Sequence, residues 1–291
     1  MDVVHAIDIT AWEGDVSEAQ RREAVEAIES GRVLFFPRLG FPIDEKERVL
    51  LTPDVSDGRA KNVSLKPDGA LRGTSCTGES AAALKRMIER FALTATHLVG
   101  SLIPAYKTHL ERASTSFRPV EIAGRPASAI YDDTRLHVDA FPSRPMGRRR
   151  ILRVFSNINP AGAARVWHVG ESFEIMAQRF LPGAHEGSRA WAQVLARLGI
   201  TKGVRSRYDT LMLSLHDGAK RDEEYQRSSS QVEICFPAGS TWMCYTDQVM
   251  HAALAGQYVL EQTFHIDVTA MVLPDRSPLR VLERLRGRLL T

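Results

Sequence analysis

A succession of short strand-like segments fills the second half of the chain and restricts its possible folds most. From residue 117 onwards, apolar runs alternate with clusters of turn-forming residues. The expected strands cover residues 126–131, 135–139, 151–158, 164–168, 210–215, 231–236, 240–246 and 258–269. Many short strands in a row are typical of a jelly roll or a barrel. We therefore expect a mainly β protein with surrounding helices, built on a double-stranded β-helix (jelly-roll, cupin-like) core.

Helical patterns precede, interrupt and follow these strands. Ser17 and Gln20 form a capping-box pattern, which predicts a helix over residues 18–30, and a buried strand should follow at 32–37. The longest helical pattern covers residues 79–112, where Pro104 should kink or split it. Further short helices are expected at residues 172–180, 188–198 and 217–226, and one is expected to be capped by Asp44 with Glu47.

These elements fit one domain over residues 1–291. We expect residues 1–116 to form a helical and irregular N-terminal support, residues 117–270 the jelly-roll core, and residues 271–291 a basic C-terminal helix. A chain of this length can bury a large core.

Composition excludes several classes of protein. Hydrophobic residues make up 44% of the chain and charged residues 25%, which is ordinary for a soluble globular protein. A net charge of +3 is too small to indicate nucleic-acid binding. There is no run of 18 apolar residues and no apolar secretory signal at the N-terminus. The three cysteines lack CxxC spacing, which fits a reducing cytoplasm and argues against a cysteine-rich zinc site.

A His-x-Asp pair, His137 and Asp139, is the strongest candidate for a metal site. On a strand, residues i and i+2 point to the same face, so one imidazole and one carboxylate can converge on one ion. Two histidines and one carboxylate with open positions are typical of non-haem Fe(II) oxygenases, and zinc accepts the same ligands. His251 is the expected third ligand. A second pair, His265 and Asp267, has no later histidine to complete such a set.

An Fe(II) oxygenase of this type usually uses 2-oxoglutarate and O2, and the far carboxylate of the keto acid needs a fixed cation. In the superfamily this cation often follows the last histidine in a Gly-x-Arg or Gly-x-Lys setting. Here that setting reads Gly256–Gln257–Tyr258. We expect Arg153, in the apolar strand 151–158, to replace it, although an internal salt bridge is an open alternative. The other candidates for 2-oxoglutarate binding are Arg150, Tyr258 and Gln262.

Four long segments of the chain resemble the 3-deoxy-D-manno-oct-2-ulosonic acid (Kdo) hydroxylase family. They are DDTRLHVDAFPSRPMGRRRILRVFSNINP, VWHVGESFE, LHDGAKRDEEYQ and GSTWMCYTDQVMHAALAGQYVLEQTF. The resemblance implies a dioxygenase that depends on Fe(II), 2-oxoglutarate and O2 and hydroxylates C3 of a lipid-linked Kdo. The product would be the 2-ulosonic acid Ko, a modified sugar of lipopolysaccharide and lipid A. Carried over residue by residue, His137, Asp139 and His251 would be the iron ligands.

Arginines near this motif suit an anionic sugar substrate. Arg135, Arg144 and Arg148 are the candidates for gripping its carboxylate or phosphates, and a solvated basic surface is the alternative. We expect a cytoplasmic enzyme that could touch the inner membrane, because residues 277–290 form a basic amphipathic pattern that either lies on the bilayer or docks on the core. Three other functions stay open: an oxygenase for another anionic small molecule, a zinc-dependent hydrolase that uses the same three ligands, and a non-catalytic jelly-roll binding protein.

Overall fold

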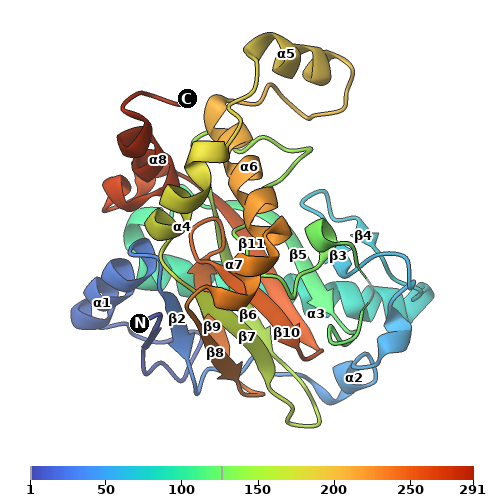
Figure 1. The fold of residues 1–291 in the computed structure, drawn as a ribbon. Helices are drawn as coiled ribbons and strands as arrows, with labels where there is room; N and C mark the ends of the chain where they lie inside the picture. The colour runs from blue at the N-terminus through green and yellow to red at the C-terminus, as the bar shows by residue number, and fades with distance from the viewer. Residues whose placement is uncertain (1, 126) are drawn as a thin grey trace.

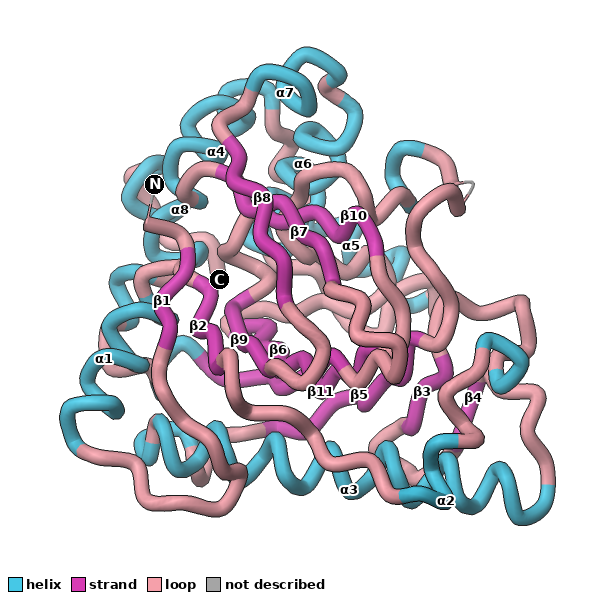
Figure 2. The backbone as a smooth tube through the Cα atoms, turned by 90° about the horizontal axis from the view of Figure 1, so that it is seen from below, coloured by secondary structure: helices cyan, strands magenta, loops and turns pink. Residues whose placement is uncertain are grey.

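Two β-sheets stacked face to face form the centre of the computed structural model, which describes residues 2–125 and 127–291. Figure 2 shows the smaller sheet lying over one face of the larger. The large sheet has the order β1 (Val4–Ala6), β2 (Val33–Phe36), β9 (Thr241–Tyr245), β6 (Arg149–Asn157), β11 (Val259–Asp267), β5 (Glu111–Arg118), β3 (Val63–Leu65) and β4 (Leu71–Arg72). The small sheet has the order β10 (His251–Ala255), β7 (Arg165–Gly170) and β8 (Gln231–Phe236).

The strands alternate between the two faces of the large sheet, and this alternation separates two cores. Between the sheets, Trp242 of β9 stacks on Phe236 at a centroid distance of 4.1 Å and on Phe155 of β6 at 5.3 Å. Trp167 of the small sheet meets the same group edge-on. Neighbouring side chains on β6, such as Val154, pack instead in the core on the outer face.

Helices α1 (Glu18–Glu29) and α3 (Gly78–Leu102) cover that outer face (Figures 1 and 2). The capping box of Ser17 and Gln20 is present, as predicted. The short helix α2 (Glu45–Arg48) likewise has the expected box of Asp44 and Glu47. Helix α3 ends before Pro104 because proline disfavours helical backbone at the residue before it. The expected helix over 79–112 is therefore too long, since β5 already begins at Glu111.

The predicted boundary between N-terminal support and core differs from the observed arrangement. Residue 117 falls inside β5, and strands β1 to β4 from the N-terminal part extend both edges of the large sheet. In the expected strand 126–131, residue 126 lies outside the described residues, and Ala129–Tyr131 form a 3-10 helix, η3. Strand β10 was not predicted.

A second group of helices covers the end of the sheets near the chain's C-terminus (Figure 1). It contains α4 (Phe173–Phe180), α5 (Arg189–Arg197), α6 (Arg207–Arg221), α7 (Glu223–Ser228) and α8 (Pro278–Arg286). The expected strand at 210–215 is wrong because it lies inside α6. Leu211, Met212 and Leu215 bury one helical face, and Ser206 with Asp209 forms a capping box. The helix expected at 217–226 is the end of α6 followed by α7.

The basic C-terminal helix α8 docks onto the protein. Leu282 is fully buried in the helical core. The arginines are paired: Arg284 lies 3.1 Å from Glu174, and Arg286 lies 3.2 Å from Glu186. Of the leucines expected on its apolar face, Leu282 is buried and Leu285 partly buried, while Leu289 is exposed. Within the described part of the chain, no helix combines the length and apolar character needed to cross a bilayer.

We expect Leu282→Ala to destabilise the protein by about 2–5 kcal/mol, because it leaves a cavity in a fully buried site. Leu289→Ala is the matched control, since this leucine is 71% exposed and should change stability by less than about 0.5 kcal/mol. Urea titration of both variants measures the difference. Equal destabilisation by the two changes would contradict the docked position of α8.

Candidate metal centre

His137, Asp139 and His251 come together at one end of the space between the two sheets. One donor atom from each lies within 4.8 Å of the others. The segment of residues 135–139 is not the expected regular strand but forms a single bridge to β10. The amide of His137 donates to the His251 carbonyl at 3.0 Å, and the His251 amide donates back at 2.8 Å. The Asp139 amide donates to the Thr246 carbonyl at 2.7 Å, so both side chains of the His-x-Asp pair are held in place.

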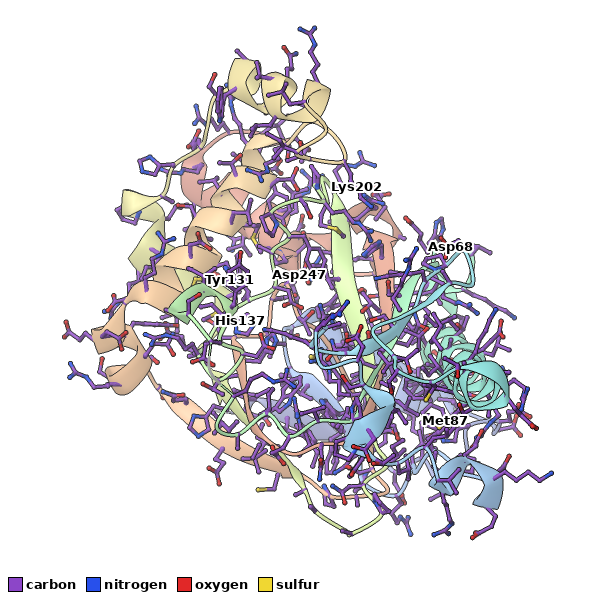
Figure 3. The ribbon with its side chains drawn as sticks, turned by 90° about the vertical axis from the view of Figure 1, so that its right-hand side faces the viewer. Asp68, Met87, Tyr131, His137, Lys202 and Asp247 are labelled. Atoms are coloured by element: carbon purple, nitrogen blue, oxygen red, sulfur yellow. The ribbon has the colours of Figure 1, made fainter. Side chains whose placement is uncertain are left out.

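Backbone carbonyls orient both imidazole rings. Nδ1 of His137 lies 2.7 Å from the Arg135 carbonyl oxygen, and Nδ1 of His251 lies 2.8 Å from that of Val249. A ring that donates from Nδ1 to a carbonyl leaves its Nε2 lone pair free for a metal ion. The His251 ring also stacks on Trp167 at a centroid distance of 5.2 Å. His137 is 5% exposed, and its label in Figure 3 lies well inside the outline of the molecule.

Electrostatics favour the protonation states that a metal ion requires. Burial lowers the pKa of His137, and the neighbouring His251 lowers it further. Burial also lowers the pKa of His251, so both rings are neutral near pH 7. Burial opposes ionisation of Asp139, but the guanidinium of Arg153 and the two histidines outweigh it and lower the pKa of this carboxyl. The result is two neutral imidazoles and one carboxylate.

A polar cavity adjoins the three donors and contains groups that lack partners. Its wall includes Arg118, Asp133, Arg153, Arg165 and Trp167. Two buried donors on this wall form no hydrogen bond within the described residues: Arg153 Nε and Trp167 Nε1. Buried polar atoms without partners are costly, so such a group of them indicates a ligand. The donor set and this wall fit a divalent metal with a bound anion.

Arg153, the residue expected to anchor 2-oxoglutarate, is already paired with two carboxylates. It lies 2.9 Å from Asp139 and 3.0 Å from Glu261. Glu261 in turn accepts a hydrogen bond from Arg118 at 2.9 Å. The internal salt bridge that the sequence left open is therefore present. Because Arg153 contacts a candidate metal ligand directly, its position suits holding Asp139 ionised and oriented.

The structure does not bring the other three candidates for 2-oxoglutarate binding into the cavity. Arg150 points to the opposite face of β6, where it lies 2.7 Å from Asp247 and over the Tyr245 ring. Gln262 lies on the opposite face of β11, where it accepts a hydrogen bond from Thr115 at 2.5 Å. Tyr258 precedes β11 and packs in the outer core, where it stacks on Phe117. Alternation along a strand is the physical reason for the positions of Arg150 and Gln262.

Arg165 on β7 lines the cavity and was not predicted from the sequence as a site residue. It is 3% exposed and donates to the Gly256 carbonyl at 2.6 Å. Within the described ranges it forms no ion pair, and burial together with Arg118 lowers its pKa to about 9. A side chain on Gly256 would meet the Arg165 backbone at 3.0 Å, so this glycine makes room for the arginine. The pattern that led to Arg153, a lone arginine inside an apolar strand, also applies to Arg165 and could have identified it.

The three arginines proposed for substrate binding lie away from the wall of this cavity. Arg135 pairs with Glu223 at 2.7 Å, and Arg148 pairs with Asp267 at 3.1 Å. Arg144 is exposed and lines a neighbouring hollow together with Phe141 and Tyr208. The structure therefore does not bring these three charges to the metal-centre cavity.

Two stacked sheets that enclose two histidines and one carboxylate define the class of jelly-roll metalloproteins to which non-haem Fe(II) oxygenases belong. A sequence model of the Kdo hydroxylase family, described as 3-deoxy-D-manno-oct-2-ulosonic acid (Kdo) hydroxylase, matches residues 11–289. The chain belongs to this family.

Solved structures of one Kdo hydroxylase, KdoO, are similar to the chain over nearly its whole length. The cobalt(II) complex is 46% identical with a TM-score of 0.96, and the match covers 99% of this chain and 97% of that one. The complex with α-ketoglutarate and Fe(III) is 45% identical, has a TM-score of 0.95 and the same coverage. Both are described as a non-haem Fe(II) α-ketoglutarate-dependent dioxygenase. A comparison with curated proteins finds no match. The predicted family and fold class are thus confirmed.

Proposed function

We propose that this protein is an Fe(II)- and 2-oxoglutarate-dependent dioxygenase that uses O2 to hydroxylate C3 of the Kdo sugar of lipopolysaccharide, giving Ko. The observation that carries the proposal is the cluster of His137, Asp139 and His251 beside an arginine-lined cavity, in a member of the Kdo hydroxylase family. The similar solved structures, which contain a metal ion and in one case the keto acid, support the cofactors.

In this proposal, His137, Asp139 and His251 hold Fe(II). Bound iron supplies the redox chemistry that couples O2 and the keto acid to oxidation of a C–H bond. The carbonyls of Arg135 and Val249 fix the two rings, and Arg153 holds Asp139 as a carboxylate. His137 and His251 are buried, which limits the access of water to the centre and so protects a reactive site from side reactions.

We propose that Arg165, assisted by Arg118, binds the far carboxylate of 2-oxoglutarate. Arg165 is a buried cation on the cavity wall without an ion pair among the described residues, and such a charge is costly until an anion binds it. Trp167 Nε1 is an unpaired buried donor on the same wall and can supply a further hydrogen bond. This proposal replaces the earlier expectation for Arg153.

The lipid-linked form of the substrate and contact with the cytoplasmic leaflet of the inner membrane are finer parts of the proposal. The exposed Arg144 and Arg148 suit phosphates of a lipid-linked sugar, because arginine binds phosphate through two parallel hydrogen bonds. Helix α8 does not support membrane contact, since Leu279 and Leu282 are buried and Arg284 and Arg286 are paired.

Incubating the protein with Fe(II), 2-oxoglutarate and Kdo-lipid A in air tests the proposed reaction. We expect mass spectrometry to show one added oxygen on the Kdo unit, together with an equal amount of succinate. Succinate formed without this addition would indicate another anionic substrate. Activity with Zn(II) alone would indicate a hydrolase instead, and no turnover with any metal would favour a binding protein.

A further inference from the structure

Helix α6 places a lysine beside the candidate metal centre. Figure 1 shows this helix running down toward the two sheets. Its residue His216 meets the His137 ring edge-on at a centroid distance of 5.5 Å, so this face of the helix lies against the metal ligands. Lys220 is four residues further along and therefore lies on the same face. The segment LHDGAKRDEEYQ, which contains both residues, has no role in the function described so far.

The ammonium of Lys220 is buried but incompletely satisfied. The residue is 2% exposed, and Nζ donates one hydrogen bond, to the Ile130 carbonyl, at 3.0 Å. In the part of the chain that the structure describes, it forms no ion pair. The Asp133 carboxylate favours the charged form of Lys220, but both of its oxygens lie 3.0 Å from Nζ of Lys61. An ammonium has three donors, and burying it with one of them used is costly unless an anion completes the set.

The other buried cations around the cavity already have anions. Arg118 and Arg153 share Glu261, and Arg153 also pairs with Asp139. Arg165 is assigned above to 2-oxoglutarate. Lys220 lies one helical turn from His216, whose ring contacts the His137 ring, so this face of α6 lies beside the metal ligands. Lys220 is thus a cation near the metal centre for which neither the described residues nor the cofactors provide a counter-ion.

We propose that Lys220 binds the C1 carboxylate of the Kdo substrate. The inference rests on the proposed function and adds the residue that recognises the sugar acid. In Kdo the C1 carboxylate is attached to C2, the neighbour of C3, so it lies two bonds from the carbon to be oxidised. Its counter-ion must therefore lie beside the metal. Arg148 is already paired with Asp267, and Arg144 is exposed in a neighbouring hollow, so both suit outlying groups of the substrate instead.

Binding to the Fe(II)- and 2-oxoglutarate-loaded protein under anaerobic conditions tests this assignment. Calorimetry would compare the methyl glycoside of Kdo with its C1 carboxamide, for the wild type, Lys220→Met and Lys220→Arg. We expect Lys220→Met to weaken binding of the carboxylate about 10- to 100-fold and to change binding of the carboxamide little. Lys220→Arg should recover part of the loss because it keeps the charge.

Arg221→Met is the matched control, because this neighbour on α6 is exposed and its ion-pair partner within the described residues is Asp217, at 3.6 Å. It should bind the carboxylate like the wild type. Affinity for 2-oxoglutarate should be the same in all variants, which excludes general damage to the site. Equal loss for carboxylate and carboxamide in Lys220→Met, or no loss for either, would overturn the inference. A wild type that oxidises no Kdo would instead refute the proposed function.

Discussion

A His251→Ala protein is expected to lose Fe(II) binding and hydroxylation together. The change removes one of three donors whose atoms lie within 4.8 Å of one another, and the two that remain cannot hold the ion in the same geometry. Mutating groups that merely orient metal ligands already costs about 10- to 100-fold in affinity, so loss of a ligand should cost more. Metal content after dialysis and succinate release at saturating 2-oxoglutarate measure the two effects separately.

His265→Gln is the informative control for this experiment, because His265 belongs to the second His-x-Asp pair. This histidine is buried near the end of the central strand β11, 3.8 Å from Glu111, and is not part of the donor cluster. The folded His265→Gln protein should bind one Fe(II) per chain and turn over normally. Retention of iron and activity by His251→Ala, or their loss in a folded His265→Gln protein, would refute the proposed ligand set.

The donor set was predictable from the sequence because its geometry depends on short-range rules. Two residues in a His-x-Asp pair need only an extended backbone to face the same way, and hydrogen bonds from His137 and Asp139 to β10 and Thr246 supply it without a regular strand. The jelly-roll core was predictable for a similar reason, since turns separate short apolar runs. The family resemblance supplied the substrate, which spacing alone does not give.

The predictions from the sequence were wrong where the structure depends on contacts between residues far apart in the chain. Residues 210–215 read as a strand, but the burial of Leu211, Met212 and Leu215 against α4 and α8 selects a helix. Arg153 and Arg165 looked alike in sequence, each a lone arginine in an apolar strand. They differ because Glu261 of β11 reaches Arg153, while Arg165 faces the carbonyl of Gly256. Which side chains meet across neighbouring strands depends on the order of the strands in the sheet, and the local sequence pattern does not give that order.

Arg165→Met is expected to raise the half-saturation concentration of 2-oxoglutarate about 10- to 100-fold. Losing a hydrogen bond between charged groups costs about 1.5–3 kcal/mol, and each 1.4 kcal/mol corresponds to a factor of ten. Calorimetric titration of the Fe(II)-loaded protein with 2-oxoglutarate, without O2, gives the affinity directly. Arg148→Met is the control, because this arginine is half-exposed and pairs with Asp267 away from the cavity. Its affinity for 2-oxoglutarate should equal that of the wild type.

Stability of the metal-free protein separates Arg165 from Arg153, because the two arginines differ in their partners. Removing Arg153 leaves Asp139 and Glu261 without a shared cation, and breaking a buried pair in this way typically costs about 3–5 kcal/mol. Removing Arg165 takes away a buried charge that forms no ion pair within residues 2–125 and 127–291, so Arg165→Met should be neutral or stabilising. A destabilised Arg165→Met protein with normal 2-oxoglutarate affinity would show that this arginine is structural. The anchoring role would then return to Arg153, whose Met variant should in that case bind the keto acid weakly.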